Sequence, residues 1–212
     1  LVRLHRAYVS ANMAVPAEKI DAFLVSKAEF ILNAQKKFAL QEQYKPQPKQ
    51  YISGETFYLQ GRALRLKVIR ASKEQLYSDG VHLFLEVKDP QDFSKKERMV
   101  MRFFDRECKE VFGEIVEELY PVFQKYGVAV PSLRIRSMDT RWGSCLPGKG
   151  VITLNKRLLE APRNCIEYVV MHELCHFIHP NHSKHFYAFL SMLMPDWKER
   201  KKVLDANDTY YL

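Results

Sequence analysis

The chain has 212 residues, of which 47% are hydrophobic and 27% are charged, the proportions of an ordinary soluble globule. This length suits one compact domain, or one domain with a small appendage, and it suffices to bury a hydrophobic core. The net charge of +8 could attract nucleic acids, nucleotides or acidic substrates, but the basic residues are scattered and favour a solubilising surface. No stretch approaches the roughly 18 consecutive apolar residues of a membrane span, so a membrane is not expected as a partner.

The N-terminus and the cysteines indicate a cytoplasmic protein. Residues 1–19 lack the uninterrupted apolar run of a secretory signal peptide. Cys108, Cys145, Cys165 and Cys175 form no C-x-x-C pair. Such spacing is typical of reduced thiols rather than of a disulfide framework.

The N-terminal part is predicted to contain one helix followed by strands. Apolar residues at helical spacing predict the helix over residues 15–38, and a loop with prolines at 44–55 ends it. In residues 56–72 and 80–88, apolar and polar residues alternate well enough to predict strands, with Leu64, Leu66 and Val68 on one face. We expect a loose boundary near residue 90, between an N-terminal α/β-rich subdomain, 1–90, and a C-terminal domain, 91–212, unless the two are continuous.

The C-terminal part is predicted to be mainly helical. The stretch 89–127 begins with turn residues. The pattern that follows predicts one long amphipathic helix that reaches Gly127. Residues 132–145 and 150–155 predict a strand pair joined by a turn. Two helices follow over 161–178 and 183–197, separated by a break at 179–181. The remainder, 198–212, is expected to be a solvated end on which Tyr210 and Tyr211 dock.

Five of the seven histidines lie between residues 171 and 186, in the stretch MHELCHFIHPNHSKHF. His172 and His176 stand four positions apart, so in a helix they project about 40° apart from one face. Two imidazoles at that spacing reach the same ion, which is why H-E-x-x-H binds zinc. The rest of this helix is apolar, and burying two histidines and a carboxylate there is costly unless a metal pairs them. The sequence therefore predicts one bound zinc ion in preference to a chance spacing on a solvated helix.

A third ligand is expected soon after the helix breaks, and three histidines are candidates. Pro180 and Asn181 supply a turn that lets the chain double back toward the metal, which favours His182. His185 is the alternative or a supporting group, and His179 is expected to point away. For His179 and His185 a surface imidazole is the simpler interpretation. A more distant glutamate ligand is possible, although no downstream carboxylate stands out.

Glu173 lies beside the two helical histidines and is predicted to be the general base rather than a ligand. Water at a zinc ion has its pKa lowered to about 7. An adjacent carboxylate can take the proton during attack and deliver it to the leaving group.

The stretch RWGSC has two interpretations of about equal merit. In the first, it is an edge strand that pairs with an extended substrate backbone. Arg141 would then hold a carboxylate or phosphate, Trp142 would stack, and Gly143 would let another backbone approach closely. In the second, Arg141 and Trp142 only fasten the strand to the helix beneath, with Trp142 in the core. Asn155, which closes the second strand, is expected to bond to the loop rather than to substrate.

The order of these motifs resembles one known family. TRWGSC, then GVITLN, then IEYVVMHELCHFIHPNHSKHF is similar to the YgjP-like metallopeptidases, which are zincins related to the WLM and SprT-type proteases. The resemblance covers most of the chain, including GETFYLQGRALRLKV at 54–68. It implies an α+β zincin-like metalloprotease domain with a small antiparallel sheet, an active-site helix and a backing helix, preceded by a small β-rich part. It also implies zinc ligation by His172, His176 and His182, and catalysis by Glu173.

Three functions fit these observations. The first is a zinc-dependent peptidase acting on a peptide or protein substrate. The second is a metal-dependent hydrolase that cuts a nucleoside triphosphate to monophosphate and pyrophosphate, with Arg134, Arg136 and Arg141 near the phosphates. The third is a zinc-containing module that binds nucleic acid through its positive surface. The motif and the resemblance favour the peptidase, although the motif specifies a water-activating centre and not its substrate.

Overall fold

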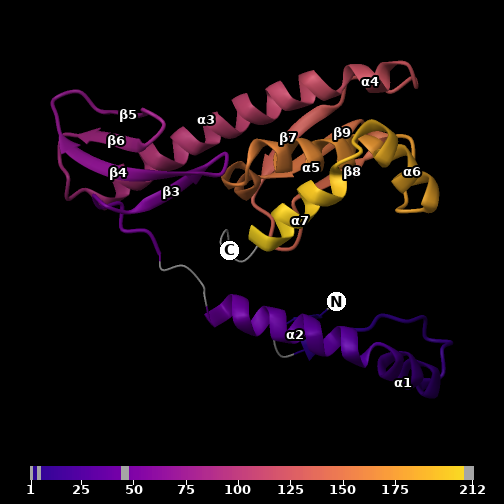
Figure 1. Ribbon diagram of the computed structural model, residues 1–212. Coiled ribbons are helices and arrows are strands. Elements are labelled where there is room, and N and C mark those ends of the chain that lie inside the picture. Colours follow the sequence, from indigo (N-terminus) through magenta and orange to yellow (C-terminus); the bar gives the residue numbers. More distant parts are fainter. Residues whose placement is uncertain (1, 4–5, 44–47, 208–212) are drawn as a thin grey trace. The chain divides into compact units, whose positions relative to one another are not determined.

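Figure 1 shows a computed structural model of the chain, in which residues 2–3, 6–43 and 48–207 are described. Tyr210 and Tyr211, for which docking is predicted, lie outside the described residues. The chain divides between Pro48 and Lys49 into two compact units.

The first unit contains two short strands and two helices. β1 (Val2–Arg3) pairs antiparallel with β2 (Arg6–Ala7), and α1 (Ala17–Ser26) precedes α2 (Ala28–Gln43). The single helix predicted over 15–38 is therefore two helices. The break falls at Lys27, whose φ of −108° and ψ of 7° leave helical geometry. Helix α1 has no buried residue, and the Phe30 side chain of α2 is 67% exposed.

The second unit begins with a mixed four-stranded sheet in the order β3-β4-β6-β5. The strands are β3 (Thr56–Leu59), β4 (Arg62–Arg70), β5 (Gln75–Ser78) and β6 (His82–Val87). β4 and β6 are parallel, whereas the other neighbours are antiparallel. Leu64 and Leu66 are buried and Val68 is half-buried, which confirms the predicted inner face of β4. β5 is an additional strand, too short for its alternation to be evident in the sequence.

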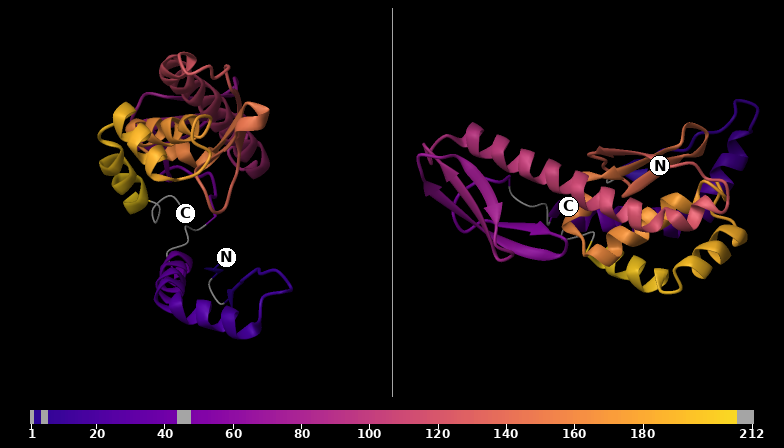
Figure 2. Two further views of the ribbon diagram at one scale, coloured as in Figure 1. Left: turned by 90° about the vertical axis from the view of Figure 1, so that its right-hand side faces the viewer. Right: turned by 90° about the horizontal axis from the view of Figure 1, so that it is seen from above.

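Helix α3 (Phe93–Leu119) runs along the second unit and contributes to both of its hydrophobic cores (Figures 1 and 2). Val100 and Phe103 pack on the four-stranded sheet, and residues from Cys108 onward pack in the other core. The long helix predicted to reach Gly127 is interrupted before α4 (Pro121–Gln124), because proline lacks the N–H that would continue the hydrogen-bond ladder. The predicted domain boundary near residue 90 falls between β6 and α3 and stays a prediction.

The second sheet has three strands in the order β7-β9-β8: β7 (Ser132–Arg136), β8 (Gly143–Leu146) and β9 (Val151–Asn155). β8 and β9 form an antiparallel hairpin through the 3-10 turn η1 (Pro147–Lys149), but β7 is parallel to β9. This sheet is therefore mixed, and the expectation of an antiparallel sheet is corrected in this respect. The parallel pairing arises because the connection 137–142 places β8 on the far side of the position that β9 occupies. β9 then returns antiparallel to β8 and lies between β8 and β7.

The remaining elements surround a central helix. After the 3-10 segment η2 (Lys156–Glu160) come α5 (Arg163–Cys175), α6 (Lys184–Leu193) and α7 (Trp197–Asn207). α5 contacts α3, α6, α7, β8 and β9, so it is enclosed on several sides. α5 and α6 agree with the two predicted helices, whereas α7 replaces the expected solvated end. The predicted α+β class is confirmed.

None of the helices in the described part of the chain has the length and apolarity required to cross a bilayer.

Candidate active site

The H-E-x-x-H stretch forms the C-terminal end of α5. The helix starts after Pro162, and His176 is its C-cap residue. Because α5 is enclosed, these polar groups are buried with it: Glu173 is 6% exposed and His176 is 8% exposed. Desolvation of this kind is costly for a charged group, so each side chain needs a specific partner.

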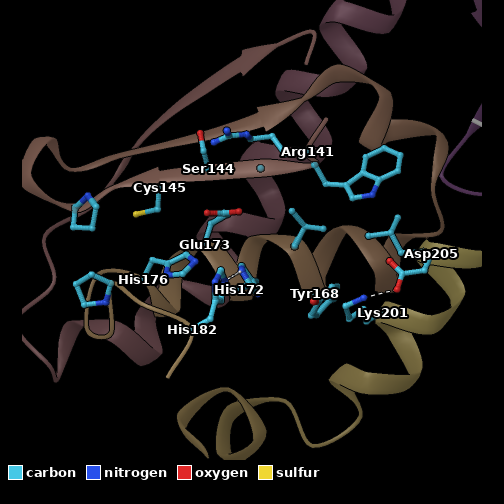
Figure 3. Close-up of a pocket in the computed structure, with 16 residues that line it drawn as sticks. Arg141, Ser144, Cys145, Tyr168, His172, Glu173, His176, His182, Lys201 and Asp205 are labelled. Carbon is cyan, nitrogen blue, oxygen red and sulfur yellow. Dashed lines mark hydrogen bonds and ion pairs between the residues drawn. The ribbon is translucent and has the colours of Figure 1, made fainter. Parts of the chain in front are cut away.

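His172, His176 and His182 come together at one point (Figure 3). One ring nitrogen from each lies within 4.8 Å of the other two, and within the described residues no other group of three His, Cys, Asp or Glu side chains has this spacing. Nε2 of His182 lies 2.9 Å from Nε2 of His172. The buried ring of Phe186 contacts all three imidazoles, with centroid distances of 4.9, 4.7 and 4.9 Å. The turn after α5 therefore returns His182 to the face of His172 and His176.

His179 and His185 do not belong to this group. Their rings stack on each other, with centroids 6.4 Å apart. The backbone carbonyl of His179 lies 3.1 Å from Nδ1 of His176, at hydrogen-bonding distance. A bond from Nδ1–H to that carbonyl leaves Nε2 of His176 with a free lone pair directed at the other two rings.

The protonation of His172 and His176 suits a metal ion. Burial, and then the neighbouring His176, His182 and Lys201, lower the pKa of His172 to about 3. Burial also lowers the pKa of His176. Neutral imidazoles offer the lone pairs that a metal requires. Together with the ring of His182, which faces them, they form a donor set that fits a divalent ion such as zinc.

On its Nδ1 side, the ring of His172 is held by packing rather than by a hydrogen bond. Its Nδ1 is buried and has no hydrogen-bond partner. The ring is instead enclosed by Phe186, at 4.9 Å between centroids, and by Tyr168, at 6.0 Å. His172 thus differs from His176, whose orientation depends on a backbone carbonyl.

Glu173 lies against the start of β8. A Cβ atom at Gly143 would meet Oε1 of Glu173 at 2.7 Å and Cγ at 2.9 Å, which is closer than atoms can pack. The sequence predicts the close approach of another backbone at Gly143, whereas the group found there is the Glu173 side chain. Burial raises the pKa of Glu173 to about 8, and the positive charge of Arg141 opposes this.

Asn155 organises the loop that leads into β8. Its Nδ2 donates to the carbonyls of Met138 and Arg141 at 2.7 and 3.0 Å, and its Oδ1 accepts from the N–H of Arg157 at 3.2 Å. The backbone N–H of Asn155 also donates to the carbonyl of Trp142 at 2.9 Å. These contacts agree with the prediction that Asn155 bonds to the loop. They hold residues 138–142, and through them Gly143, in one position.

Trp142 combines features of both interpretations of RWGSC. It is half-buried against the main core, and the guanidinium of Arg157 lies 5.5 Å from its ring centroid. It also lines the pocket that contains the three histidines. Packing and exposure to a ligand are therefore compatible at this position.

A pocket of about 510 Å³ lies between β8 and the helices α5 and α7 (Figure 3). The predicted site residues all line it: Arg141, Trp142, Gly143, His172, Glu173, His176 and His182. The structure adds Tyr168 from α5, and Lys201, Leu204 and Asp205 from α7, where Lys201 and Asp205 form an ion pair. Tyr168 stands four positions before His172, a spacing that could have revealed it. No sequence signal marks the α7 residues.

Arg134 and Arg136 do not line this pocket. They lie on β7, at the opposite edge of the sheet from β8. Of the three arginines considered for phosphate binding, the structure brings only Arg141 to the histidines.

The family model for the YgjP-like metallopeptidase domain matches residues 2–207 of the chain. The chain belongs to the YgjP-like metallopeptidase family. As a member of a metallopeptidase family it is a hydrolase, so the predicted family and enzyme class are confirmed. The family also implies a catalytic metal.

Two solved structures are similar to part of this YgjP-like metallopeptidase. One is the metallopeptidase zymogen jannalysin of Methanocaldococcus jannaschii, with 22% identity and a TM-score of 0.38 over 45% of this chain and 88% of that chain. The other is the metallopeptidase zymogen abylysin of Pyrococcus abyssi, with 22% identity and a TM-score of 0.39 over 47% of this chain and 93% of that chain. No curated protein matches the chain.

Proposed function

We propose that this YgjP-like metallopeptidase is a zinc-dependent peptidase that cleaves extended polypeptide segments in the pocket beside β8. His172, His176 and His182 would hold one zinc ion. Zinc bound there would supply Lewis acidity to the scissile carbonyl and to the attacking water. The observation that carries the proposal is that three clustered imidazoles and the buried side chain of Glu173 line one pocket next to an edge strand.

Glu173 would serve as the general base. Its carboxylate is 6% exposed, and desolvation makes a carboxylate a stronger base. It would accept a proton from the attacking water at one carboxylate oxygen and deliver that proton to the amide nitrogen of the leaving group. The contact with Gly143 restricts the carboxylate to one side of the pocket.

The edge strand β8 would bind the substrate backbone. β8 pairs only with β9 in its sheet, and Gly143, Ser144 and Cys145 line the pocket. An extended peptide can add to such an edge by main-chain hydrogen bonds, which recognise a backbone rather than particular side chains. Arg141, two residues before this strand, would contact an acidic group of the substrate.

We expect the Glu173→Gln variant to lose peptidase activity by about 100-fold or more, because glutamine cannot accept the proton. The zinc-loaded chain and the variant would be incubated with an unfolded protein and with a quenched peptide library. In parallel, a nucleoside triphosphate panel would be assayed for pyrophosphate release. Equal zinc content in the two proteins is the control. Pyrophosphate release that requires Glu173, without peptide cleavage, would replace the peptidase by a nucleotide hydrolase.

The ligand set has its own test, made by elemental analysis of the purified protein. His182→Ala should lose most of the zinc, since it removes one of three ligands. His185→Ala is the matched control and should retain one zinc per chain. The reverse result would assign the third ligand to His185. Because imidazole sites bind several transition metals, the chain is best purified without added metal, so that the metal acquired in the cell is measured.

We also propose that the protein works in the cytoplasm. Its four cysteines are unpaired, and Cys108, Cys165 and Cys175 are buried. Unpaired thiols are typical of reducing compartments. Cell fractionation with an antibody to the chain would test this, and recovery with the periplasmic or secreted fraction would contradict it.

A further inference from the structure

One face of the four-stranded sheet takes no part in the proposed peptidase site. The inner face packs on α3 through Leu64, Leu66 and their neighbours. Residues of β4 alternate between buried and exposed, so Arg65 and Lys67 project from the opposite face. On β6 the alternation places Phe84 on that opposite face as well. We call this surface of β4, β6 and β5 the outer face (Figures 1 and 2).

The outer face carries a group of stacked rings. Tyr77 of β5 pairs with Phe84 of β6, and their rings stack at 5.1 Å between centroids with an interplanar angle of 17°. Nζ of Lys67 lies 5.3 Å from the centroid of Phe84, and the ring of His82 lies at 5.7 Å. Tyr77 is 42% exposed, so part of its ring is open to a ligand.

The outer face also carries positive charge. On β4, Arg65 and Lys67 are exposed there, and neither forms an ion pair with another described residue. Arg62 and Arg70 are exposed as well, but the alternation of β4 places them on the side of Leu64 and Leu66. The carboxylate on this face, Glu86, accepts hydrogen bonds from Nε2 of Gln75 at 2.8 Å and from the hydroxyl of Tyr77 at 3.3 Å. Arg65 and Lys67 therefore lie two positions apart on one strand, on the face that carries the exposed ring of Tyr77.

We propose that the outer face binds single-stranded nucleic acid. Phosphates would contact Arg65 and Lys67 on β4, and bases would stack on Tyr77 two strands away. Cationic surface that tracks a backbone, combined with aromatic side chains on which bases stack, is the combination by which proteins bind single strands without sequence preference. A duplex keeps its bases stacked inside and could use only the charges. An acidic polypeptide would match the charges but gains less from the exposed ring.

The test is fluorescence anisotropy of the full-length chain with a labelled single-stranded DNA of about 20 nucleotides, long enough to fill such a site. The double variant R65E/K67E should weaken binding about tenfold or more, and the slope of log affinity against log salt should fall by about 0.7 for each lost phosphate contact. Tyr77→Ser should weaken binding about tenfold without changing that slope. The control K109E/K202E makes the same change in net charge on exposed helical positions and should have a much smaller effect.

Three results would overturn the proposal. The first is that the chain does not bind single-stranded DNA even at low salt. The second is that R65E/K67E and K109E/K202E weaken binding equally, which would mean attraction by net charge alone. The third is that polyglutamate displaces the DNA at a much lower concentration than unlabelled DNA does, which would identify an acidic protein partner. Unchanged melting temperatures and zinc content would show that the variants fold.

This inference is independent of the peptidase proposal. Glu173→Gln should bind DNA as the wild type does, and R65E/K67E should cleave peptides as the wild type does. If DNA binding is absent while peptides are cleaved, only the nucleic-acid proposal fails. If peptides are not cleaved while DNA binds, only the peptidase proposal fails.

Discussion

At Gly143 the edge strand β8 comes close to the Glu173 side chain of the active-site helix α5. A methyl group there would overlap Oε1 of Glu173 at 2.7 Å, so Gly143→Ala must displace the carboxylate or the strand. We expect activity to fall about 100-fold, because a displacement of about 1 Å at a catalytic group has that effect. The free energy of unfolding should fall by about 1–3 kcal/mol from overpacking. Steady-state kinetics and denaturant unfolding measure the two effects.

Gly113 offers the matched control. It lies within α3, and a Cβ atom there would meet nothing within 4 Å. Gly113→Ala should therefore raise the free energy of unfolding by about 0.5–1 kcal/mol, since alanine favours the helix, and leave activity unchanged. Full activity in Gly143→Ala would show that the carboxylate does not need its present position.

At the scale of elements, the short segment η2 contains a half-buried acid, Glu160, whose titration affects stability. Burial raises the pKa of Glu160 from 4.5 to about 7, and the charges of Arg157 and Lys49 oppose this. Between these two pH values the folded chain holds a proton that the unfolded chain releases. The free energy of unfolding should therefore fall as pH rises through this window, and the stabilisation is fully present only below it.

Glu160→Gln should remove this pH dependence, on the order of 2 kcal/mol between pH 5 and pH 8. Urea unfolding of the wild type and the variant at the two pH values measures it. Glu117→Gln, an exposed acid on α3, is the control and should behave as the wild type does. If wild type and Glu160→Gln lose stability equally with rising pH, other groups are responsible.

Helix α7 shows how an element with little sequence signal can form part of the pocket. In α7 only Trp197 and Leu204 are buried hydrophobic residues, so its apolar stripe is narrow. It is held in addition by Arg200, which donates to Glu167 at 2.6 Å and to the carbonyl of Asn164 at 3.2 Å, both at the start of α5. Ionic contacts between distant segments leave no periodic pattern, which is why this stretch resembles a solvated end.

For the whole molecule, the chain divides between Pro48 and Lys49, and none of the described residues before Lys49 belongs to either hydrophobic core of the second unit or lines the candidate site. A chain starting at Lys49 should therefore fold, bind one zinc ion and unfold within a few degrees of the full chain. Thermal unfolding followed by circular dichroism measures this.

A chain starting at Arg62 is the comparison for that deletion. It would lack β3 and also Tyr51, which is 5% exposed in the core of the first sheet. It should be strongly destabilised because a large buried ring is removed. Failure of the chain starting at Lys49 to fold would show that the first unit is required for the stability of the second.

Some features of the fold could be predicted from sequence because they depend on local periodicity. The alternation of Leu64, Leu66 and Val68 defines the inner face of β4 within one strand. The parallel pairing of β7 with β9 could not be predicted in this way, because it depends on where the 137–142 connection crosses the sheet. The break before α4 does have a local signal, Pro121, which outweighs the continuing apolar pattern.

In the candidate site too, some features follow from local sequence and others only from tertiary packing. The sequence alone determined that His172, Glu173 and His176 share one helix face, since the 3.6-residue period of a helix requires it. The turn residues before His182 predicted its return to that face. Only the tertiary structure decided that Glu173 packs on Gly143, 30 positions away, and that α7, which begins 22 positions after the end of α5, lines the pocket. Contacts of that range are set by the packing of whole elements, and no local pattern encodes them.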